Sequence, residues 1–383
     1  MKKVAFIVEP NFDKLHFGVR NFFSTVKDVL SEDNITDFVM FLSDNHEVSW
    51  YRIVLDIQSE VNENSNYMSY ERGKNLPFTY GEYLQFEKRQ DKRKIKTKYY
   101  FQYIGRSLEK EGYDICIITN PWLMRSGIEL HAGKIYGFVY DFIANMFVLT
   151  KKDKPLDWAN LHRIGYECYN NLCDYIVGDS ESVAEQYAEY YPQIDRGRIK
   201  YFAPFIPYQY RSVQYSGERK ENAVILAAPF DIRKGIKLIP GLLNSLIDSL
   251  DVLYIYGQPR CSSVDFDDFF GKLNVKRIRF YPYASYSELI RLYQKSKFLL
   301  FPSTQEGLGI PLLESQVCGC RIVTTDEAPM NTLGVEGAYF LTGNMDKDSA
   351  IMNEMLRDEL FNYAELSRKA ARRFAVSNVL SVF

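Results

Sequence analysis

Short strand-like runs rich in β-branched residues alternate with amphipathic helical patterns along most of this chain. The run KVAFIV (3–8) precedes a helical pattern over 18–30, and NAVILAA (222–228) precedes one that starts at Gly235. This alternation is typical of parallel sheets with helices packed against them. A chain of 383 residues exceeds what one hydrophobic core usually serves. The sequence therefore predicts an α/β protein with two doubly wound domains.

The expected domains follow from the strand positions and from a proline-containing, aperiodic stretch between the halves. Further strands are predicted at 37–42, 51–57, 114–119, 135–140, 174–179 and 199–204, and then at 251–257, 277–282, 297–303 and 320–325. We expect an N-terminal domain over 1–205, a C-terminal domain over 206–370, and a helix over 371–383 that packs back on the first domain. Residues 58–95 lack a clean period and are interpreted as an insertion near the acceptor side of the first domain.

Charge and composition exclude several classes of protein. The net charge of −2 offers no basic field for a nucleic acid. The six cysteines have neither zinc-site spacing nor a disulfide framework, which is typical of a reducing compartment. Because no apolar stretch approaches the roughly 20 residues of a membrane span, we expect a cytosolic protein. The basic run 87–98 is expected to be a solvated helix face, and peripheral contact with the inner face of the membrane is the alternative.

Ligands of doubly wound domains bind at the carboxyl ends of the strands, and one such end carries two acids. In EGLGIPLLE, Glu306 precedes a glycine-containing loop and Glu314 lies on the predicted helix that follows. The free N–H groups of that helix favour an anion such as diphosphate. We expect Pro311 in the first helical turn and Gly319 as the C-cap. From the two acids alone, a strand-to-helix turn with solvated carboxylates is an equal alternative. No G-x-G-x-x-G follows a strand, which argues against a dinucleotide-dependent oxidoreductase.

The Glu306–x7–Glu314 pattern resembles the E-x7-E element of the retaining glycosyltransferases of family 4. Three further segments are similar to that family in the same order: 173–187, 230–243 and 285–303. The resemblance implies the GT-B fold, with two Rossmann-like domains facing a central cleft. It also implies transfer of a sugar from a nucleotide-diphosphate sugar, without a metal or other cofactor, to a hydroxyl of a glycan or lipid-linked glycan.

The resemblance implies a role for each matching residue in the donor site. Glu314 would accept hydrogen bonds from the ribose hydroxyls, and Glu306 would bind hydroxyls of the donor sugar. Arg233 and Lys234 would neutralise the diphosphate as it leaves. The remaining implied contacts are the backbone of Gly307, Leu308 and Gly309, the helix N-terminus at Gly18, and the pair Tyr140 and Asp141.

Two positions depart from the family pattern. Many members carry an arginine where this chain has Ala228, and a His-Asp pair where it has Tyr140 and Asp141. Because of these departures, a non-catalytic partner subunit of the same fold is one alternative to an active glycosyltransferase. A GT-B enzyme of different chemistry, such as an epimerase or an inverting transferase, is the other. Asp265, Asp267 and Asp268 could suggest a metal-binding D-x-D element, but the surrounding phenylalanines favour an ordinary helix face.

Overall fold

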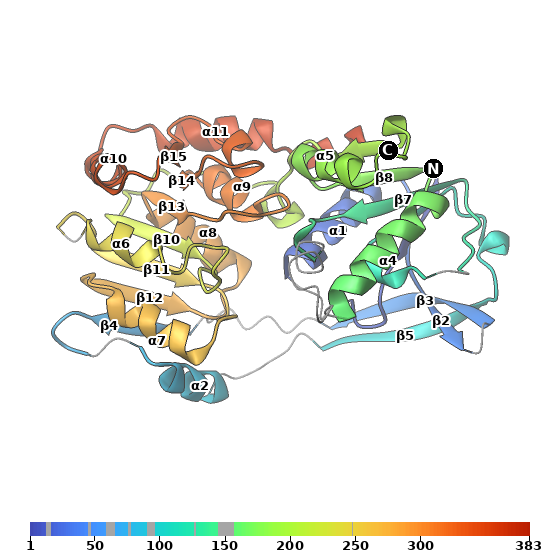
Figure 1. Cartoon of the computed structure of the whole chain (residues 1–383), viewed down its shortest axis with the longest axis horizontal. Helices are drawn as coiled ribbons and strands as arrows, with labels where there is room; N and C mark the ends of the chain where they lie inside the picture. The colour runs from blue at the N-terminus through green and yellow to red at the C-terminus, as the bar shows by residue number, and fades with distance from the viewer. Residues whose placement is uncertain are drawn as a thin grey trace. The chain divides into compact units, whose positions relative to one another are not determined.

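The computed structural model describes residues 1–12, 17–44, 47–58, 66–75, 78–89, 96–125, 128–144, 157–246 and 248–383. The chain forms two compact units. Unit 1 comprises Met1–Ser59, Ile95–Tyr208 and Ala375–Phe383, and unit 2 comprises Glu60–Lys94 and Gln209–Phe374. Within each unit a central sheet is covered by helices (Figure 1).

Unit 1 is built on a sheet with the strand order β5-β3-β2-β1-β6-β7-β8-β9. Strand β1 pairs parallel with both β2 and β6, and the parallel pairing continues through β7 and β8 to β9. Strand β3 pairs antiparallel with both β2 and β5. Its strands are β1 (Lys3–Ile7), β2 (Ile35–Asp44), β3 (Glu47–Gln58), β5 (Lys96–Gly105), β6 (Ile115–Ile118), β7 (Lys134–Val139), β8 (Tyr175–Gly178) and β9 (Ile199–Tyr201). Its α-helices are α1 (Phe17–Leu30), α4 (Asp157–Leu172) and α5 (Glu181–Tyr190).

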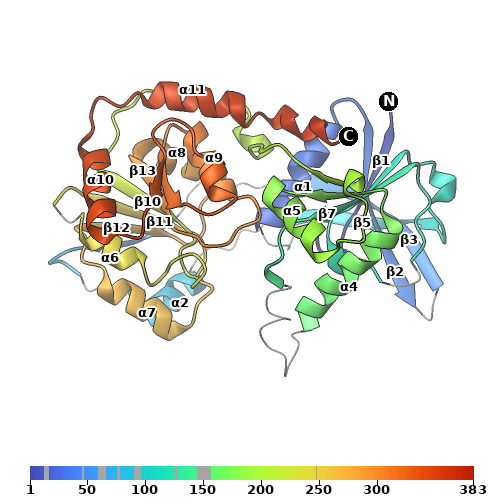
Figure 2. The same ribbon diagram turned by 45° about the horizontal axis from the view of Figure 1, so that its top comes forward.

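Unit 2 is built on a sheet with the order β15-β14-β13-β10-β11-β12-β4, parallel except for β4. Its strands are β4 (Met68–Glu71), β10 (Ala223–Ala227), β11 (Val252–Tyr256), β12 (Arg277–Tyr281), β13 (Phe298–Phe301), β14 (Arg321–Thr325) and β15 (Tyr339–Leu341). Its helices are α2 (Tyr80–Arg89), α6 (Ile239–Asn244), α7 (Ser263–Lys272), α8 (Tyr286–Lys295), α9 (Ile310–Val317), α10 (Met345–Arg357) and α11 (Tyr363–Arg373). Helices α6 and α7 cover one face of this sheet and α8 and α9 the other (Figure 2).

The stretch interpreted as an insertion of the first domain belongs to unit 2 instead. Strand β4 pairs antiparallel with β12, where Tyr70 lies opposite Ile278. The following segment places Phe78 against Phe270 of α7, with ring centroids 5.1 Å apart. These aromatic side chains are buried in the core of unit 2. The expectation of an insertion near the acceptor side of the first domain is therefore wrong. This stretch instead adds a strand and a helix to unit 2, so the boundary between the units is crossed more than once in the sequence.

The C-terminal segment returns to unit 1. Helix α11 ends at Arg373, and a 3₁₀ segment (Val376–Ser381) follows it. Asn378 donates a hydrogen bond to the carbonyl of Pro204 at 2.8 Å, and Lys200 donates to the carbonyl of Val382 at 3.0 Å. The chain thus passes between the two units at 59–60, 94–95, 208–209 and 374–375.

The helix expected to start at Gly235 begins only at Ile239. Residues 231–238 form turns, and Gly235 has a φ of +78° that no right-handed helix accommodates. Pro240 lies in the first turn of α6, where its missing N–H costs no helical hydrogen bond. The basic pair before Gly235 is therefore part of a loop, not of a first helical turn.

Candidate functional site

The two loops singled out in the sequence meet at the carboxyl ends of neighbouring strands. Strands β10 and β13 pair in the sheet, so the segments that follow them start side by side. The backbone N–H of Thr304 donates to the carbonyl of Arg233 at 2.9 Å, and the Thr304 hydroxyl donates to the same oxygen at 3.2 Å. A Cβ atom on Gly235 would lie 2.9 Å from the carbonyl oxygen of Pro302. Only glycine lets the two loops approach this closely.

A carboxylate and two cations form the centre of this site. The Glu306 Oε1 atom lies 2.8 Å from Nη1 of Arg233 and 3.5 Å from Nζ of Lys234. Ser303 donates its hydroxyl proton to the same oxygen at 2.8 Å. Arg233 also donates to the carbonyl of Gln305. The structure therefore brings together three of the residues expected to act on the donor.

The cations of this cluster are held away from bulk water. Burial lowers the pKa of Lys234, and the charge of Glu306 opposes that shift. The Lys234 Nζ atom also lies over the ring of Phe301, 5.1 Å from its centroid. A third cation, Arg260, follows β11 and is exposed, and partial desolvation together with the charge of Arg233 lowers its pKa. The positive charge of Arg233 disfavours the cationic form of Arg260, so the electrostatic potential between them is positive. A bound anion would reduce this repulsion.

Helix α9 starts at this cluster as predicted. Gly309, with a φ of +82°, is its N-cap, and Pro311 lies in its first turn. The helix ends at Val317, and Gly319 adopts the left-handed conformation with a φ of +72°. Leu308 in the preceding loop is buried.

The second acid is buried among tyrosines rather than solvated. Glu314 is 3% exposed, and burial raises its pKa to about 8. The hydroxyl of Tyr293 on α8 donates to Glu314 Oε2 at 3.3 Å. The alternative of two solvated carboxylates on an ordinary turn is therefore wrong, because Glu306 is ion-paired and Glu314 lies inside the protein.

In unit 1 the expected residues lie along the carboxyl end of its own sheet. Tyr140 and Asp141 directly follow β7, and Gly18 is the second residue of α1. The Tyr140 hydroxyl is buried without a hydrogen-bond partner among the described residues, as is Oδ1 of Asn120 after the neighbouring strand β6. Buried polar atoms of this kind usually have partners, so both are candidates to contact a polar ligand. Asp141 Oδ1 accepts from the N–H of Ile143 at 3.0 Å.

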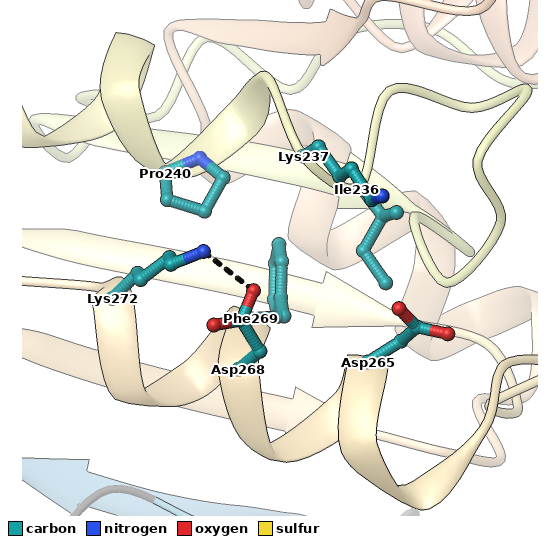
Figure 3. Close-up of a pocket in the computed structure, with 7 residues that line it drawn as sticks. All are labelled: Ile236, Lys237, Pro240, Asp265, Asp268, Phe269 and Lys272. Carbon is teal, nitrogen blue, oxygen red and sulfur yellow. Dashed lines mark hydrogen bonds and ion pairs between the residues drawn. The ribbon is translucent and has the colours of Figure 1, made fainter.

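The three aspartates on α7 have separate structural partners. Asp265 accepts from the Ser262 hydroxyl at the helix N-cap, and Asp268 pairs with Lys272 at 2.6 Å. Asp267 accepts from the N–H of Tyr80 at 2.6 Å. Figure 3 shows Asp268 directed toward Lys272 and Asp265 a turn away, beside Ile236. This supports the interpretation of α7 as an ordinary helix. Among the residues that the structure describes, no group of three His, Cys, Asp or Glu side chains could hold a metal ion.

Sequence reasoning missed several members of the site. Ser303, Arg260 and Tyr293 were not singled out, although each lies in or next to a segment that was. A strand-order argument could have found Arg260, because it follows the strand next to β10. No sequence signal could have found Tyr293, because its contact with Glu314 depends on how α8 packs beside α9.

Ala228, which stands where many relatives of the resembled family carry an arginine, has a left-handed backbone with a φ of 44°. Its N–H donates to the carbonyl of Tyr256 at 2.7 Å, and a Cβ on Gly257 would lie 2.7 Å from the Cβ of Ala228. The ends of β10 and β11 are thus packed closely at a position with no charge.

Among the described residues no helix is both long enough and apolar enough to cross a bilayer.

A known protein family matches the part of unit 2 that carries the cluster of Arg233, Lys234 and Glu306. Residues 218–374 match the family model described as glycosyl transferases group 1. The chain is 24% identical over 220 residues to the serotype-specific mannosyltransferase WbdA of Escherichia coli, a match that covers 53% of this chain and 27% of WbdA. The chain spans about a quarter of the length of the curated relatives it matches.

Solved structures resemble the chain over its whole length. A mutant of S. aureus TarM, in complex with fondaparinux, alpha-GlcNAc-glycerol and UDP, has a TM-score of 0.60 at 13% identity, covering 100% of this chain and 98% of TarM. Anabaena HepE in complex with UDP-glucose has a TM-score of 0.56 at 12% identity, with coverage of 100% and 98%. These similarities confirm the predicted GT-B fold of two Rossmann-like domains.

Proposed function

We propose that this GT-B protein, whose residues 218–374 match the model of the group 1 glycosyl transferases, is a retaining hexosyltransferase. It transfers a sugar from a nucleotide-diphosphate sugar to a hydroxyl of a glycan or lipid-linked glycan, without a metal ion. The observation that carries the proposal is the cluster of Arg233, Lys234 and Glu306 at the N-terminus of α9.

The diphosphate of the donor binds to the two cations and to the first N–H groups of α9. Arg233 offers a planar fork of donors and Lys234 a compact charge, and both lie beside the glycine-containing loop. Arg260 adds a third positive charge from the loop after β11 and compensates for the uncharged Ala228. Preorganised cations and N–H groups of this kind stabilise the negative charge that develops on a leaving diphosphate.

The two acids bind the two ends of the donor. Glu314 accepts hydrogen bonds from the ribose hydroxyls, and Glu306 binds hydroxyls of the donor sugar after the diphosphate has taken over its cations. The backbone of Gly307, Leu308 and Gly309 borders the sugar and the phosphates, as the left-handed Gly309 allows a close approach.

The reaction breaks the bond between the sugar's anomeric carbon and the diphosphate oxygen. The acceptor's hydroxyl oxygen bonds to the same face of that carbon, and its proton passes to the departing phosphate. Glu306 orients and stabilises the sugar and forms no covalent bond to it. We also assign Gly18, Tyr140 and Asp141 of unit 1 to donor binding, because the buried hydroxyl of Tyr140, which has no hydrogen-bond partner among the described residues, can donate to a sugar oxygen.

The acceptor is proposed from the relatives. WbdA is a mannosyltransferase, and the TarM complex contains a glycan and alpha-GlcNAc-glycerol. An acceptor of the glycan or lipid-linked glycan class fits both, and we place the reaction in the cytosol. A lipid-linked acceptor would require contact with the inner membrane face. Of the basic run 87–98, residues 87–89 end α2 and residues 96–98 begin β5, so the expected single helix face is not formed there, and residues 90–95 lie outside the described residues.

The experiment that tests the donor site compares nucleoside diphosphates with the corresponding monophosphates. Wild type is expected to bind one diphosphate more tightly than its monophosphate in calorimetric titrations with UDP, GDP, ADP and TDP. Lys234→Ala is expected to weaken the diphosphate by about 10- to 100-fold, the scale of a charge-assisted contact, and to leave the monophosphate nearly unchanged.

Lys237→Ala is the matched control, because Lys237 is exposed beside α7, three residues further along the same segment (Figure 3). Equal losses in both variants would contradict the assignment of the phosphate site. Absence of binding to any diphosphate would favour the non-catalytic partner subunit that Ala228 leaves open. The anomeric configuration of the product, determined by NMR, distinguishes a retaining from an inverting enzyme.

A further inference from the structure

Tyrosine side chains from three separate elements surround the buried acid of α9. Tyr293 comes from α8, Tyr256 is the last residue of β11, and Tyr210 ends the 3₁₀ turn Tyr208–Tyr210. Tyr210 and Tyr293 are fully buried, as Glu314 nearly is. Such a concentration of hydroxyl groups around one carboxyl group is more than packing requires, because phenylalanine would fill the same volume without a polar atom to satisfy.

The hydroxyl groups form a chain that ends on the acid. The Tyr256 and Tyr293 hydroxyl oxygens lie 2.7 Å apart, and the Tyr293 hydroxyl donates to Glu314 Oε2. A phenol has only one proton to donate. Since Tyr293 gives its proton to the carboxyl group, its oxygen must accept the proton of Tyr256. When Glu314 is ionised, the carboxylate can only accept, and the direction of both hydrogen bonds is then fixed.

We propose that Tyr293, supported by Tyr256, is a positioning residue that holds Oε2 of Glu314 and thereby presents Oε1 to the ribose hydroxyls of the donor nucleotide. This inference rests on the donor role proposed above for Glu314. Tyr293 itself touches no ligand in this scheme. It acts by fixing the rotamer of the acid and by stabilising its negative charge through a hydrogen bond.

The arrangement makes nucleotide binding dependent on pH. Burial raises the pKa of Glu314, and the hydrogen bond from Tyr293 opposes the shift. Among the described residues, the titratable groups that face Glu314 are Tyr210, Tyr256 and Tyr293 from neighbouring elements and Cys318, the C-cap of its own helix. Burial raises the pKa of each of them, so all are neutral near pH 7 and none supplies a positive charge.

A protonated Glu314 must lose its proton before it can accept two ribose hydroxyl protons. The affinity for the nucleotide is therefore expected to rise with pH, by up to about tenfold per pH unit, until Glu314 is ionised in the free protein. Removing the hydroxyl of Tyr293 takes away a donor that favours the ionised form, so the plateau should move to higher pH.

The test is a series of calorimetric titrations between pH 6 and pH 9 with the nucleoside diphosphate that wild type binds. Tyr293→Phe is expected to weaken binding about tenfold at pH 7, the effect of one lost hydrogen bond to a charged group, and to recover as the pH is raised. Tyr256→Phe should shift the profile in the same direction by less. Glu314→Gln should bind weakly with no dependence on pH in this range.

Tyr187→Phe is the matched control. Its hydroxyl is buried in unit 1, 2.7 Å from Oδ1 of Asn170. Removing it therefore measures the loss of stability that follows from deleting any buried tyrosine hydroxyl, apart from an effect on Glu314. An unchanged pH profile in both Tyr293→Phe and Tyr256→Phe would overturn the inference while leaving the proposed function intact. If Tyr293→Phe does not fold, the profile of Tyr256→Phe decides alone. Absence of nucleotide binding by wild type would overturn both proposals.

Discussion

Arg233 and Glu306 form an ion pair that joins the loops after β10 and β13, with Nη1 and Oε1 2.8 Å apart. Their side chains are 23% and 15% exposed, so the pair is shielded from much of the solvent screening that weakens surface pairs. The carboxylate holds the cations that a diphosphate would otherwise bind. In the proposed donor site, a diphosphate competes with Glu306 for Arg233, and displacement would make the acid available to the sugar.

Glu306→Gln separates these two roles. Without the carboxylate, the cations lose their internal competitor, so affinity for a nucleoside diphosphate is expected to stay equal or rise severalfold. The transfer rate is expected to fall by about 10² to 10³, the scale of one lost stabilising group in an active site. Steady-state kinetics and calorimetry on the same preparation measure both effects.

Asp268→Asn serves as the control for Glu306→Gln, because the exposed pair of Asp268 and Lys272 lies on the surface of the same unit. It is expected to change neither value. A Glu306→Gln variant that loses nucleotide affinity but keeps its turnover would show that the acid supports the phosphate site only.

Gly235→Ala is expected to destabilise unit 2. The new Cβ would lie 2.9 Å from the carbonyl oxygen of Pro302, in a backbone conformation with a φ of +78°. The combined strain is expected to cost about 1–3 kcal/mol of unfolding free energy, measured by denaturant titration followed by near- and far-ultraviolet circular dichroism. Gly271→Ala, within α7 and with nothing within 4 Å of its Cβ position, is expected to be neutral or stabilising by up to about 1 kcal/mol.

The buried acid predicts how stability varies with pH. The pKa of Glu314 is raised from 4.5 to about 8 in the folded state, so the folded protein holds this proton more tightly than the unfolded chain. Its contribution to stability is fully present below pH 4.5 and is lost as the pH rises toward 8, by at most about 1.4 kcal/mol per pH unit. The free energy of unfolding of Glu314→Gln should therefore fall less than that of wild type between pH 5 and pH 8.

Glu327→Gln is the control for that comparison, since Glu327 is exposed in the same unit. It should follow the wild-type curve. Parallel curves for wild type and Glu314→Gln would mean that Glu314 is ionised throughout this range and that its burial is incomplete in solution.

The anchor of α2 on α7 offers a prediction outside the site. Asp267 Oδ1 accepts from the N–H of Tyr80, the first residue of α2. Asp267→Ala is expected to cost about 1–2 kcal/mol, as the loss of a helix-capping carboxylate does, and to speed hydrogen exchange over residues 80–89. Exchange that rises equally across β10 and β11 would instead indicate a loss of stability throughout unit 2.

Most strands of the two sheets could be predicted from the sequence because they are short apolar runs bounded by turn residues, whereas β5 and β15 were missed. Strand β10 was expected at 222–228 and lies at Ala223–Ala227, and α9 starts and ends where Pro311 and Gly319 indicate. The motif around Glu306 could be placed for the same reason, since a strand end and a helix start bracket it.

Strand β4, helix α2 and the tyrosine chain could not be predicted, for a different physical reason. Each depends on which distant surface a segment packs against. Tyr70 is buried because β4 pairs with β12, more than 200 residues later in the chain. The pKa of Glu314 is raised because side chains of α8 and β11 help to enclose its carboxyl group. Local periodicity carries no information about such partners.

Strand β4 also determines what counts as an independently folding fragment. It covers the open edge of β12 with a segment that precedes the rest of unit 2 by more than a hundred residues. A fragment of residues 209–374 would leave the outer edge of β12 unpaired and Phe270 and Phe280 without their aromatic neighbour Phe78. Bare edges of this kind recruit other chains and aggregate. Chimeras that exchange the second domain between relatives must therefore carry residues 66–89 with residues 209–374, or supply that strand as a separate peptide.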